Sequence, residues 1–233
     1  MKNLNIFSLV AEYENAKSRG VLDVPNVSFV DEDSSVRYLL ELDPYNGHEY
    51  VDLGLPSGLK WATCNVGATN PEDYGLYFAW GETTGYTAEQ VTSGVRVFTE
   101  DEYNAGPASS ISTELTLAQD AAHVNLGGKW RMPTEAECQE LLDNCNVVWT
   151  DDYNGTGVAG MMFTSRVNGN SVFFPAAGFC YRSSVEYVGS FGYYWSDSWD
   201  SEYTAWSLYF NSVRQYLYDD LRYYGFSVRG VFK

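Results

Sequence analysis

Residues 181–224 form the segment that most restricts what this chain can fold into. Ten of the 19 tyrosines lie there with Trp195, Trp199 and Trp206, while serine and aspartate fill most gaps and lysine is absent. The segment is too polar for one continuous core strand, so we expect short strands with one buried and one wet side. Tyrosine and tryptophan supply contact area at small entropy cost, and serine and aspartate supply adaptable hydrogen bonds. This composition predicts a recognition surface rather than an active site.

Alternating apolar and polar residues predict short β-strands in the C-terminal half of the chain. Trp206, Leu208 and Phe210 alternate with smaller or more polar residues, so we expect one buried and one wet side there. Asn168-Gly169 and the run 56–58 are typical of hairpin turns. The expected strands are 147–150, 160–166, 171–175, 193–198, 205–210, 213–218 and 225–232.

Helices are expected before these strands. Thr134 follows a proline and can act as an N-cap, and Glu137 three residues later completes a capping box. Apolar residues at helical spacing give the helix 134–144 one inward side. The run 116–124 is a second candidate helix. One or two early helices followed by many short strands predict an α+β domain.

Residues 1–45 differ from the rest of the chain and are too few to bury a core of their own. Within them we expect a short helix over 7–16, and then short strands interrupted by Pro25 and by the acidic run 31–33. This segment should pack on the main domain, on a neighbouring subunit or on a larger assembly. The main domain should span 46–233, with 72–81 buried and 85–112 forming a long surface loop.

The charge of the chain restricts its partners. It has 31 Asp and Glu against 14 Lys and Arg, a formal net charge of −17. Phosphate binding needs a basic face, so we expect no nucleic acid and no anionic membrane as a partner. No stretch approaches the ~20 apolar residues of a membrane span. The early apolar run 6–10 is too short for a secretory signal, so we expect synthesis in the cytoplasm without a signal peptide and no membrane insertion.

The residue types that carry catalysis or metal binding lack a supporting pattern. The four cysteines match no zinc spacing, and free buried thiols are expected. His48 and His123 are isolated in the sequence. The aspartate pairs 151–152 and 219–220 are more typical of solvated loops than of calcium ligands. We therefore expect no enzyme activity, no metal and no cofactor.

Several phrases of the sequence occur in the same order in a known family. They are VDLGLPSGLKWATCNVGA (51–68), YFAWGE (77–82), WRMPTEAECQELLDNC (130–145), FFPAAGF (173–179), GYYWSDS (192–198), AWSLYF (205–210) and YGFSVRGV (224–231). From about residue 48 to its end, the chain resembles the Fibrobacter major paralogous domain family. This resemblance implies a C-type lectin fold in the version used by formylglycine-generating enzymes. Those enzymes use two cysteines near the C-terminus, whereas here only Cys180 lies in the last third.

The resemblance also implies a source of sequence diversity. Gut Bacteroidales phages and bacteria use this domain as a target of diversity-generating retroelements, which mutate template adenines and leave framework residues fixed. Asn-type codons thereby become codons for Tyr, Ser, Asp and others. The segment 181–224 resembles such a variable region. The framework residues would be Trp195, Ala205, Leu208, Phe210, Gly225, Phe226, Val228 and Arg229.

We expect the residues between this framework to form a ligand-binding patch without catalytic residues. The aromatic anchors would be Tyr187, Trp199, Tyr203, Tyr209, Tyr216, Tyr218 and Tyr223. Adaptable hydrogen bonds would come from Ser183, Ser201, Ser207 and Ser212. Charge specificity would come from Asp197, Asp200, Arg214, Asp219, Asp220 and Arg222.

The partner implied by the resemblance is a protein or glycan on a host cell surface. The chain would be a receptor-binding protein displayed on a phage virion, such as its tail, or outside the cell after lysis. Residues 1–45 would attach it to a phage structural protein. Two alternatives stay open: a structural module whose tyrosines are buried in subunit contacts, and an enzyme on the same fold.

Overall fold

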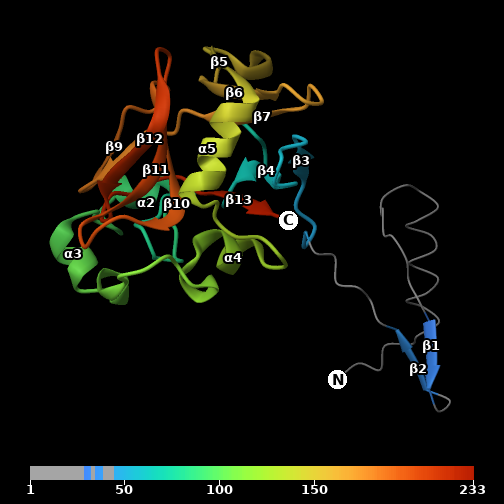
Figure 1. The fold of residues 1–233 in the computed structure, drawn as a ribbon. Coiled ribbons are helices and arrows are strands. Elements are labelled where there is room, and N and C mark those ends of the chain that lie inside the picture. Colours follow the sequence, from blue (N-terminus) through green and yellow to red (C-terminus); the bar gives the residue numbers. More distant parts are fainter. Residues whose placement is uncertain (1–28, 33–34, 39–44) are drawn as a thin grey trace. The chain divides into compact units, whose positions relative to one another are not determined.

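The computed structural model describes residues 29–32, 35–38 and 45–233 (Figure 1). The chain divides into two units, Met1–Pro44 and Tyr45–Lys233. In the first unit, β1 (Phe29–Glu32) and β2 (Ser35–Tyr38) pair as an antiparallel hairpin. β1 includes part of the acidic run at which the sequence predicts an interruption. The helix predicted over 7–16 lies outside the described residues.

The first and last strands of the second unit lie in one sheet. Its order is β13 (Arg229–Phe232), β4 (Lys60–Asn65) and β3 (Tyr50–Asp52), and both pairings are antiparallel. β3 and β4 form the hairpin that the sequence predicts. Gly58 in its turn has φ of +76°, a left-handed conformation that favours glycine.

A second sheet is a meander of β5 (Cys145–Thr150), β6 (Gly160–Ser165) and β7 (Ser171–Pro175). The hairpin predicted at Asn168-Gly169 joins β6 to β7 and is confirmed. Most of β7 is buried, and it packs against β4 of the first sheet.

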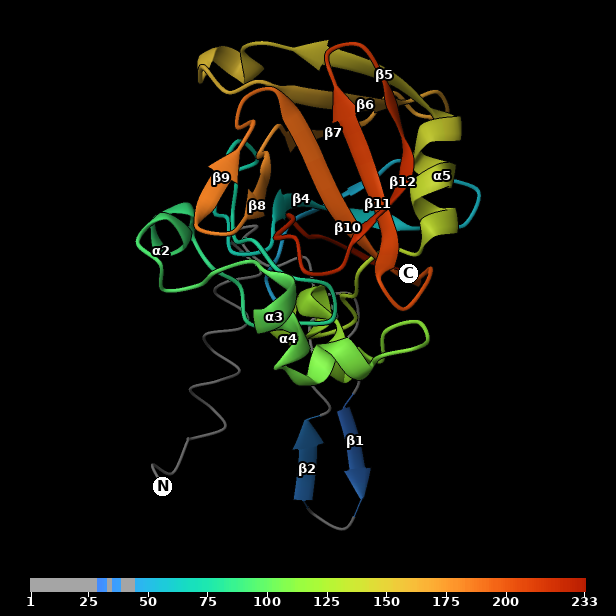
Figure 2. The same ribbon diagram turned by 90° about the vertical axis from the view of Figure 1, so that its left-hand side faces the viewer.

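The third sheet contains β10 (Phe191–Trp199), β11 (Thr204–Asn211) and β12 (Gln215–Leu221), which lie side by side in Figure 2. The short hairpin of β8 (Phe179–Tyr181) and β9 (Ser184–Glu186) contacts β10. The predicted one-sided burial of β11 is wrong, because Ala205, Ser207 and Leu208 are all fully buried. β11 is the central strand, and each of its sides faces one of two core clusters.

The predicted helix over 134–144 is confirmed as α5 (Glu135–Asn144). The Thr134 hydroxyl accepts a hydrogen bond from the Glu137 N–H at 3.1 Å, and the Glu137 carboxylate accepts one from the Thr134 N–H at 2.9 Å. This is the predicted capping box. Arg131 donates two further bonds to the same carboxylate, which fixes its orientation. α5 buries Cys138 and Leu141, and it contacts β10, β11 and β12.

The helix predicted over 116–124 is divided at Asp120. A 3-10 turn, η2 (Leu117–Gln119), precedes that residue, and α4 (Ala121–Leu126) follows it. The Asp120 carboxylate accepts hydrogen bonds from the backbone N–H groups of His123 and Met132. Asp120 therefore starts a new helix instead of continuing the first one.

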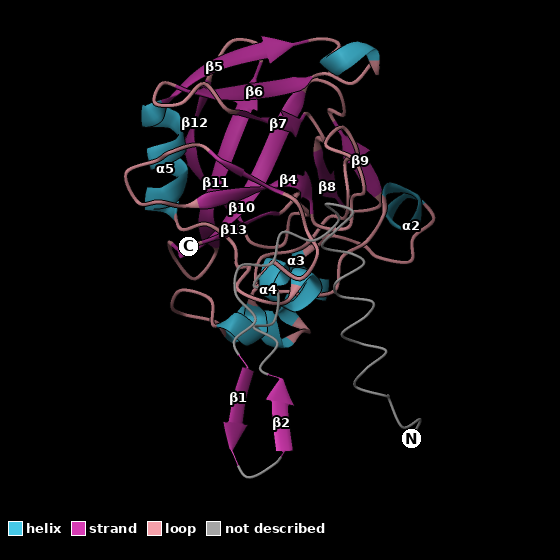
Figure 3. Ribbon diagram, turned by 90° about the vertical axis from the view of Figure 1, so that its right-hand side faces the viewer, coloured by secondary structure: helices cyan, strands magenta, loops and turns pink. Residues whose placement is uncertain are grey.

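The surface loop predicted over 85–112 is wrong. The structure forms α2 (Ala88–Thr92), α3 (Glu100–Asn104) and η1 (Pro107–Ser110) there (Figure 3). Val91, Phe98 and Tyr103 from this region are buried in the core. One more 3-10 turn, η3 (Tyr153–Gly155), follows β5.

Each residue assigned to a fixed framework is buried. These residues are Trp195, Ala205, Leu208, Phe210, Gly225, Phe226, Val228 and Arg229. Trp206, which the sequence also places in the core, is only half-buried. The expected mixed α+β architecture is confirmed, with short helices and many short antiparallel strands in small sheets. In the described part of the chain, no helix has the length and apolar character of a membrane span.

Candidate binding face

The register of the third sheet places aromatic residues from three strands in one row. Tyr193 of β10 pairs with Tyr209 of β11, and Tyr209 pairs with Tyr216 of β12. Side chains alternate along a strand, so Tyr218 and Asp220 lie on the same side of β12 as Tyr216. The other side of the sheet packs on α5.

The rings of this row contact one another. Ring centroids are 5.0 Å apart between Tyr193 and Tyr209, 4.9 Å between Tyr209 and Tyr216, and 6.1 Å between Tyr216 and Tyr218. Separations of this kind are typical of favourable aromatic pairs. The sheet therefore presents a continuous aromatic surface on this side.

The β8–β9 hairpin and the segment after β12 extend this surface. Tyr187 stacks on Phe191 with centroids 4.7 Å apart, and Phe179 lies 5.1 Å from Tyr193 and 5.3 Å from Tyr224. We call the connected set the tyrosine face. It consists of Phe179, Tyr181, Tyr187, Phe191, Tyr193, Tyr209, Tyr216, Tyr218, Tyr223 and Tyr224.

Tyr187 is held in a strained backbone conformation. Its φ is 57°, in the left-handed region that L-residues other than Asn and Asp rarely adopt. Gly178 allows the hairpin to approach closely, since a Cβ there would lie 2.0 Å from the Glu186 carbonyl oxygen. Strain of this kind is often found at binding sites.

Exposure differs among the expected aromatic anchors on this face. Tyr187, Tyr216 and Tyr218 are exposed, with fractions of 56%, 38% and 51%. Tyr209 is 9% exposed, and its hydroxyl accepts a hydrogen bond from the Asn211 amide at 2.6 Å. Tyr209 therefore supports the neighbouring rings more than it offers contact area of its own, which corrects its expected role as an anchor.

Asp220 is the carboxylate within the aromatic surface. It accepts a hydrogen bond from the Ser207 hydroxyl at 2.6 Å. Burial raises the pKa of Asp220 to about 6, and the neighbouring charge of Asp219 adds to this increase. Burial and the charge of Asp220 in turn raise the pKa of Tyr193.

The expected polar residues in the turns lie around the ends of the hairpins. Asp200 accepts a hydrogen bond from the Thr204 hydroxyl at 2.6 Å, and the Ser201 and Thr204 hydroxyl oxygens are 2.5 Å apart. These residues belong to the β10–β11 turn. At the opposite end of the sheet, Ser212 and Arg214 are exposed in the β11–β12 turn. Ser183 is exposed in the β8–β9 turn.

Tyr203 borders a pocket beside the tyrosine face. The residue is 62% exposed. The pocket has a volume of about 280 Å³, and its lining includes Tyr203, Tyr223, Glu100, Glu202 and Arg222. Because the Tyr223 ring lies 5.0 Å from that of Tyr224, this pocket adjoins the tyrosine face.

Arg222 is buried, which corrects its expected role in charge specificity. It is 1% exposed. Its guanidinium donates to the Tyr103 hydroxyl at 3.0 Å and to the carbonyl oxygens of Glu202 at 3.0 Å and Ala108 at 2.6 Å. The guanidinium carbon also lies 4.7 Å from the centre of a Trp80 ring. Arg222 therefore ties the end of β12 to the segment around α3 and η1.

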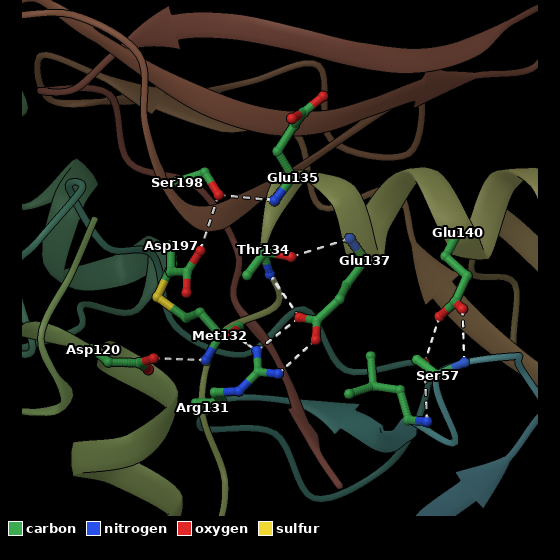
Figure 4. Close-up of polar contacts among 11 residues, drawn as sticks. Ser57, Asp120, Arg131, Met132, Thr134, Glu135, Glu137, Glu140, Asp197 and Ser198 are labelled. Carbon is green, nitrogen blue, oxygen red and sulfur yellow. Dashed lines mark hydrogen bonds and ion pairs between the residues drawn. The ribbon is translucent and has the colours of Figure 1, made fainter. Parts of the chain in front are cut away.

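Asp197 lies apart from the tyrosine face, near the start of α5 (Figure 4). The Ser198 hydroxyl donates to the Asp197 carboxylate at 3.0 Å and accepts from the Glu135 N–H at 2.9 Å. Burial raises the pKa of Asp197 to about 6, although the Ser198 hydrogen bond and the charge of Arg131 oppose this increase. Asp197 supports the helix start instead of the expected ligand contact.

Two further expected contacts, Ser207 and Asp219, are also misplaced, whereas the role expected of Trp199 stays a prediction. Ser207 is fully buried, so its hydroxyl serves Asp220 and not a ligand. Asp219 pairs in register with Trp206 and lies on the opposite side of β12 from Tyr218. Trp199 is half-buried, and its indole N–H is buried without a hydrogen-bond partner in the described part of the chain.

Sequence reasoning missed five aromatic members of the face. These are Phe179, Tyr181, Phe191, Tyr193 and Tyr224. Tyr193 pairs with the expected anchor Tyr209, so knowledge of the strand register would have identified it as a neighbour on the same side of the sheet. Phe179 and Tyr181 precede or begin the expected variable region, and no local pattern indicates that their hairpin lies beside β10.

The cysteine thiols and the His123 imidazole, which are residue types that catalysis often uses, lie in surroundings typical of a structural role. All four cysteines are free thiols, as expected, although Cys64 is only half-buried. His123 Nδ1 lies 2.9 Å from the Trp130 carbonyl oxygen. Within residues 45–233, no group of three or more His, Cys, Asp or Glu side chains is placed to hold a metal ion.

Comparisons of the chain with protein-family models, with curated proteins and with solved structures found no match.

Proposed function

We propose that this protein is a non-enzymatic binding protein whose tyrosine face contacts a protein or glycan on a host cell surface. The observation that carries this proposal is the unbroken series of ring contacts from Tyr187 to Tyr218, which ends at exposed rings on both sides. A contiguous exposed aromatic surface is costly in an isolated soluble protein and usually marks an interaction site.

The arrangement supports recognition by a rigid surface. The exposed rings of Tyr216 and Tyr218 lie on β12, which pairs along its length with β11, whose Leu208 and Phe210 are fully buried. Tyrosine side chains on a fixed sheet lose little conformational entropy on binding. Binding energy would be concentrated in a few rings, with the turn residues Ser183, Ser212 and Arg214 adjusting hydrogen bonds and charge at the edge.

We further propose that residues 46–233 adopt the C-type lectin fold of formylglycine-generating enzymes and carry a variable region diversified by a retroelement. The support is the separation of the two residue classes within 181–224. The framework residues, among them Trp195 and Leu208, are buried, whereas Tyr187, Tyr203 and Tyr218 are exposed. Exposed positions can change without loss of the core.

Display on a phage virion, with residues 1–45 as the attachment segment, is the setting that we propose for this face. A structural module with the same face buried between subunits is the alternative. The two differ in assembly: the binding protein keeps the tyrosine face open, whereas the structural module forms an oligomer that covers it. Light scattering on Tyr218→Ser and on the unchanged protein distinguishes them, because only a face buried between subunits makes the mass depend on Tyr218.

Binding to cells tests the proposed function. Purified protein is applied to a panel of Bacteroidales strains, and bound protein is measured by flow cytometry. We expect Tyr216→Ser and Tyr218→Ser to weaken binding, because each removes an exposed ring. Tyr50→Ser is the matched control, since Tyr50 is 40% exposed on β3, outside the tyrosine face. Equal losses in all three variants, with unchanged folding, would contradict the proposal.

A further inference from the structure

Among the described residues, one donor reaches the Asp220 carboxylate, which can accept several hydrogen bonds. The Ser207 hydroxyl donates to Oδ2, while Oδ1 has no hydrogen bond from the described part of the protein. Asp220 is half-buried, and Oδ1 is not among the buried polar atoms that lack a partner, so this oxygen stays open to a donor or cation from a ligand.

Within residues 45–233, no cation forms an ion pair with Asp220. The ion pairs of residues 45–233 join Lys60 to Asp52, Arg131 to Glu137, and Arg96 to two glutamates. Arg222 follows directly after β12, but its guanidinium is bound to carbonyl oxygens and to Tyr103. Arg182 lies over the Tyr181 ring, and Arg214 lies in the distant β11–β12 turn.

Aromatic rings surround Asp220. Tyr218 precedes it by two residues on the same side of β12, and Tyr193 of β10 is within range of its charge. Burial raises the pKa of Tyr224, and the neighbouring Tyr223 and Tyr181 raise it further. The charge of Asp220 makes a smaller contribution in the same direction. The faces of tyrosine rings attract cations, and the attraction is stronger where water is excluded. Rings and a free carboxylate together are complementary to a positive charge.

We propose that the tyrosine face binds a positively charged side chain of a protein ligand, with Asp220 as the counter-charge and Tyr193 and Tyr218 as aromatic contacts. The inference rests on the proposed function and specifies its ligand chemistry. The formal net charge of −17 favours the approach of a basic partner at low ionic strength. Asp220 thereby acts as a specificity residue whose charge is not paired within residues 45–233.

The interaction should depend on pH. The free protein holds the pKa of Asp220 at about 6, mainly through burial. The groups around it are Ser207 of β11, Tyr193 of β10, Tyr218 and Tyr224 on its own side, and the adjacent Asp219 on the other side of β12. None of them becomes positive on acidification. Because only the ionised carboxylate attracts a cation, we expect binding to be about tenfold weaker at pH 5 than at pH 7.

The test is an NMR titration of the 15N-labelled full chain with two peptides. One is acetyl-Gly-Lys-Gly amide, and the other replaces lysine by norleucine, which lacks only the ammonium group. We expect the lysine peptide to bind about tenfold more tightly, with shifts confined to β10, β12 and the β8–β9 hairpin. Asp220→Asn should abolish this preference and its pH dependence. Asp219→Asn is the matched control and should keep both, because it removes the same charge from the other side of β12.

Three outcomes would overturn the inference. They are equal affinity for both peptides, equal losses in Asp219→Asn and Asp220→Asn, and tighter binding of a neutral disaccharide at the same amides. A failure here is distinguishable from failure of the proposed function. If both peptides bind equally but Tyr218→Ser still loses cell binding, the tyrosine face binds its ligand without a cation.

Discussion

At Asp220, the proposed binding of a cation and the stability of the fold place opposite demands on one carboxyl group. Its folded pKa of about 6 lies above the ordinary value of 3.8, so protonation favours the folded state. That stabilising effect is complete below the ordinary value and is lost as pH rises through 6. At neutral pH the ionised group therefore lowers the free energy of unfolding.

Removal of this charge is predicted to stabilise the fold. Asp220→Asn should raise the free energy of unfolding by about 1–3 kcal/mol at pH 7.5, because the amide oxygen can still accept from Ser207 without a buried charge. The gain should shrink at pH 4, where Asp220 of the unchanged protein is protonated. Urea unfolding at both pH values measures it, and a variant less stable at pH 7.5 would contradict the burial argument.

Arg229 is a buried residue whose charge serves the fold. It is 1% exposed, and it donates to the Asn65 side chain and to the carbonyl oxygens of Ala62, Thr63 and Phe173. Its bonds join β13 to β4 and to the end of β7. No ion pair within residues 45–233 includes it.

Lysine cannot replace this guanidinium. Arg229→Lys leaves several carbonyl oxygens without donors, so we predict a loss of about 2–4 kcal/mol in the free energy of unfolding. Thermal and urea unfolding measure the loss. Arg166→Lys is a suitable control, because Arg166 is exposed and its bonds are near the surface. Similar losses in the two variants would show that burial of Arg229 is unimportant.

Among the elements, those with strong local signals were predictable. α5 begins at Thr134 because a capping box with Glu137 satisfies the first N–H groups, and both residues are visible in the sequence. The hairpin at Asn168-Gly169 follows from turn chemistry alone. A local signal is not sufficient, because α2 also begins with a capping box, formed by Thr87 and Gln90, in a region that the sequence predicted as a loop.

Elements that depend on tertiary packing were missed. α2 and α3 have five residues each, which is too short to show a repeated apolar pattern in the sequence. They are stabilised because Val91 and Tyr103 are buried in the core. On β11, alternation suggested one wet side, but a central strand with a core on both sides has none. Ser207, on this strand, was assigned to the surface for that reason. Arg222 was assigned there because the sequence does not show that Tyr103 and Trp80 cover it.

The capping box gives a prediction at this scale. Thr134→Ala removes the acceptor for the Glu137 N–H, and we expect a loss of about 1 kcal/mol in the free energy of unfolding. Urea unfolding measures it. Thr113→Ala is the control, because the exposed Thr113 hydroxyl bonds only the neighbouring Glu114 carbonyl oxygen. A loss no larger than that of Thr113→Ala would show that the box adds little to α5.

At the scale of the whole molecule, the tyrosine face is assembled from segments that lie apart in the sequence. β10, β11 and β12 give the central row, the β8–β9 hairpin adds Tyr187, and the segment after β12 adds Tyr223 and Tyr224. Composition predicts that these tyrosines form a surface, because they are too many and too polar in context for one core. It does not predict which neighbour each ring meets, since that depends on strand register.

The central claim is that exposed positions of this face vary while the buried ones are fixed. The most direct measurement is to sequence this gene and its flanking DNA in many isolates. We predict substitutions at Tyr187, Tyr216 and Tyr218. We also predict a nearby DNA segment that nearly copies the 3′ end of the gene and differs from it only at template adenines. Ser207 and Arg222, which the structure buries within the same segment, should stay constant. Substitutions spread evenly over buried and exposed positions, without such a copy, would contradict the claim.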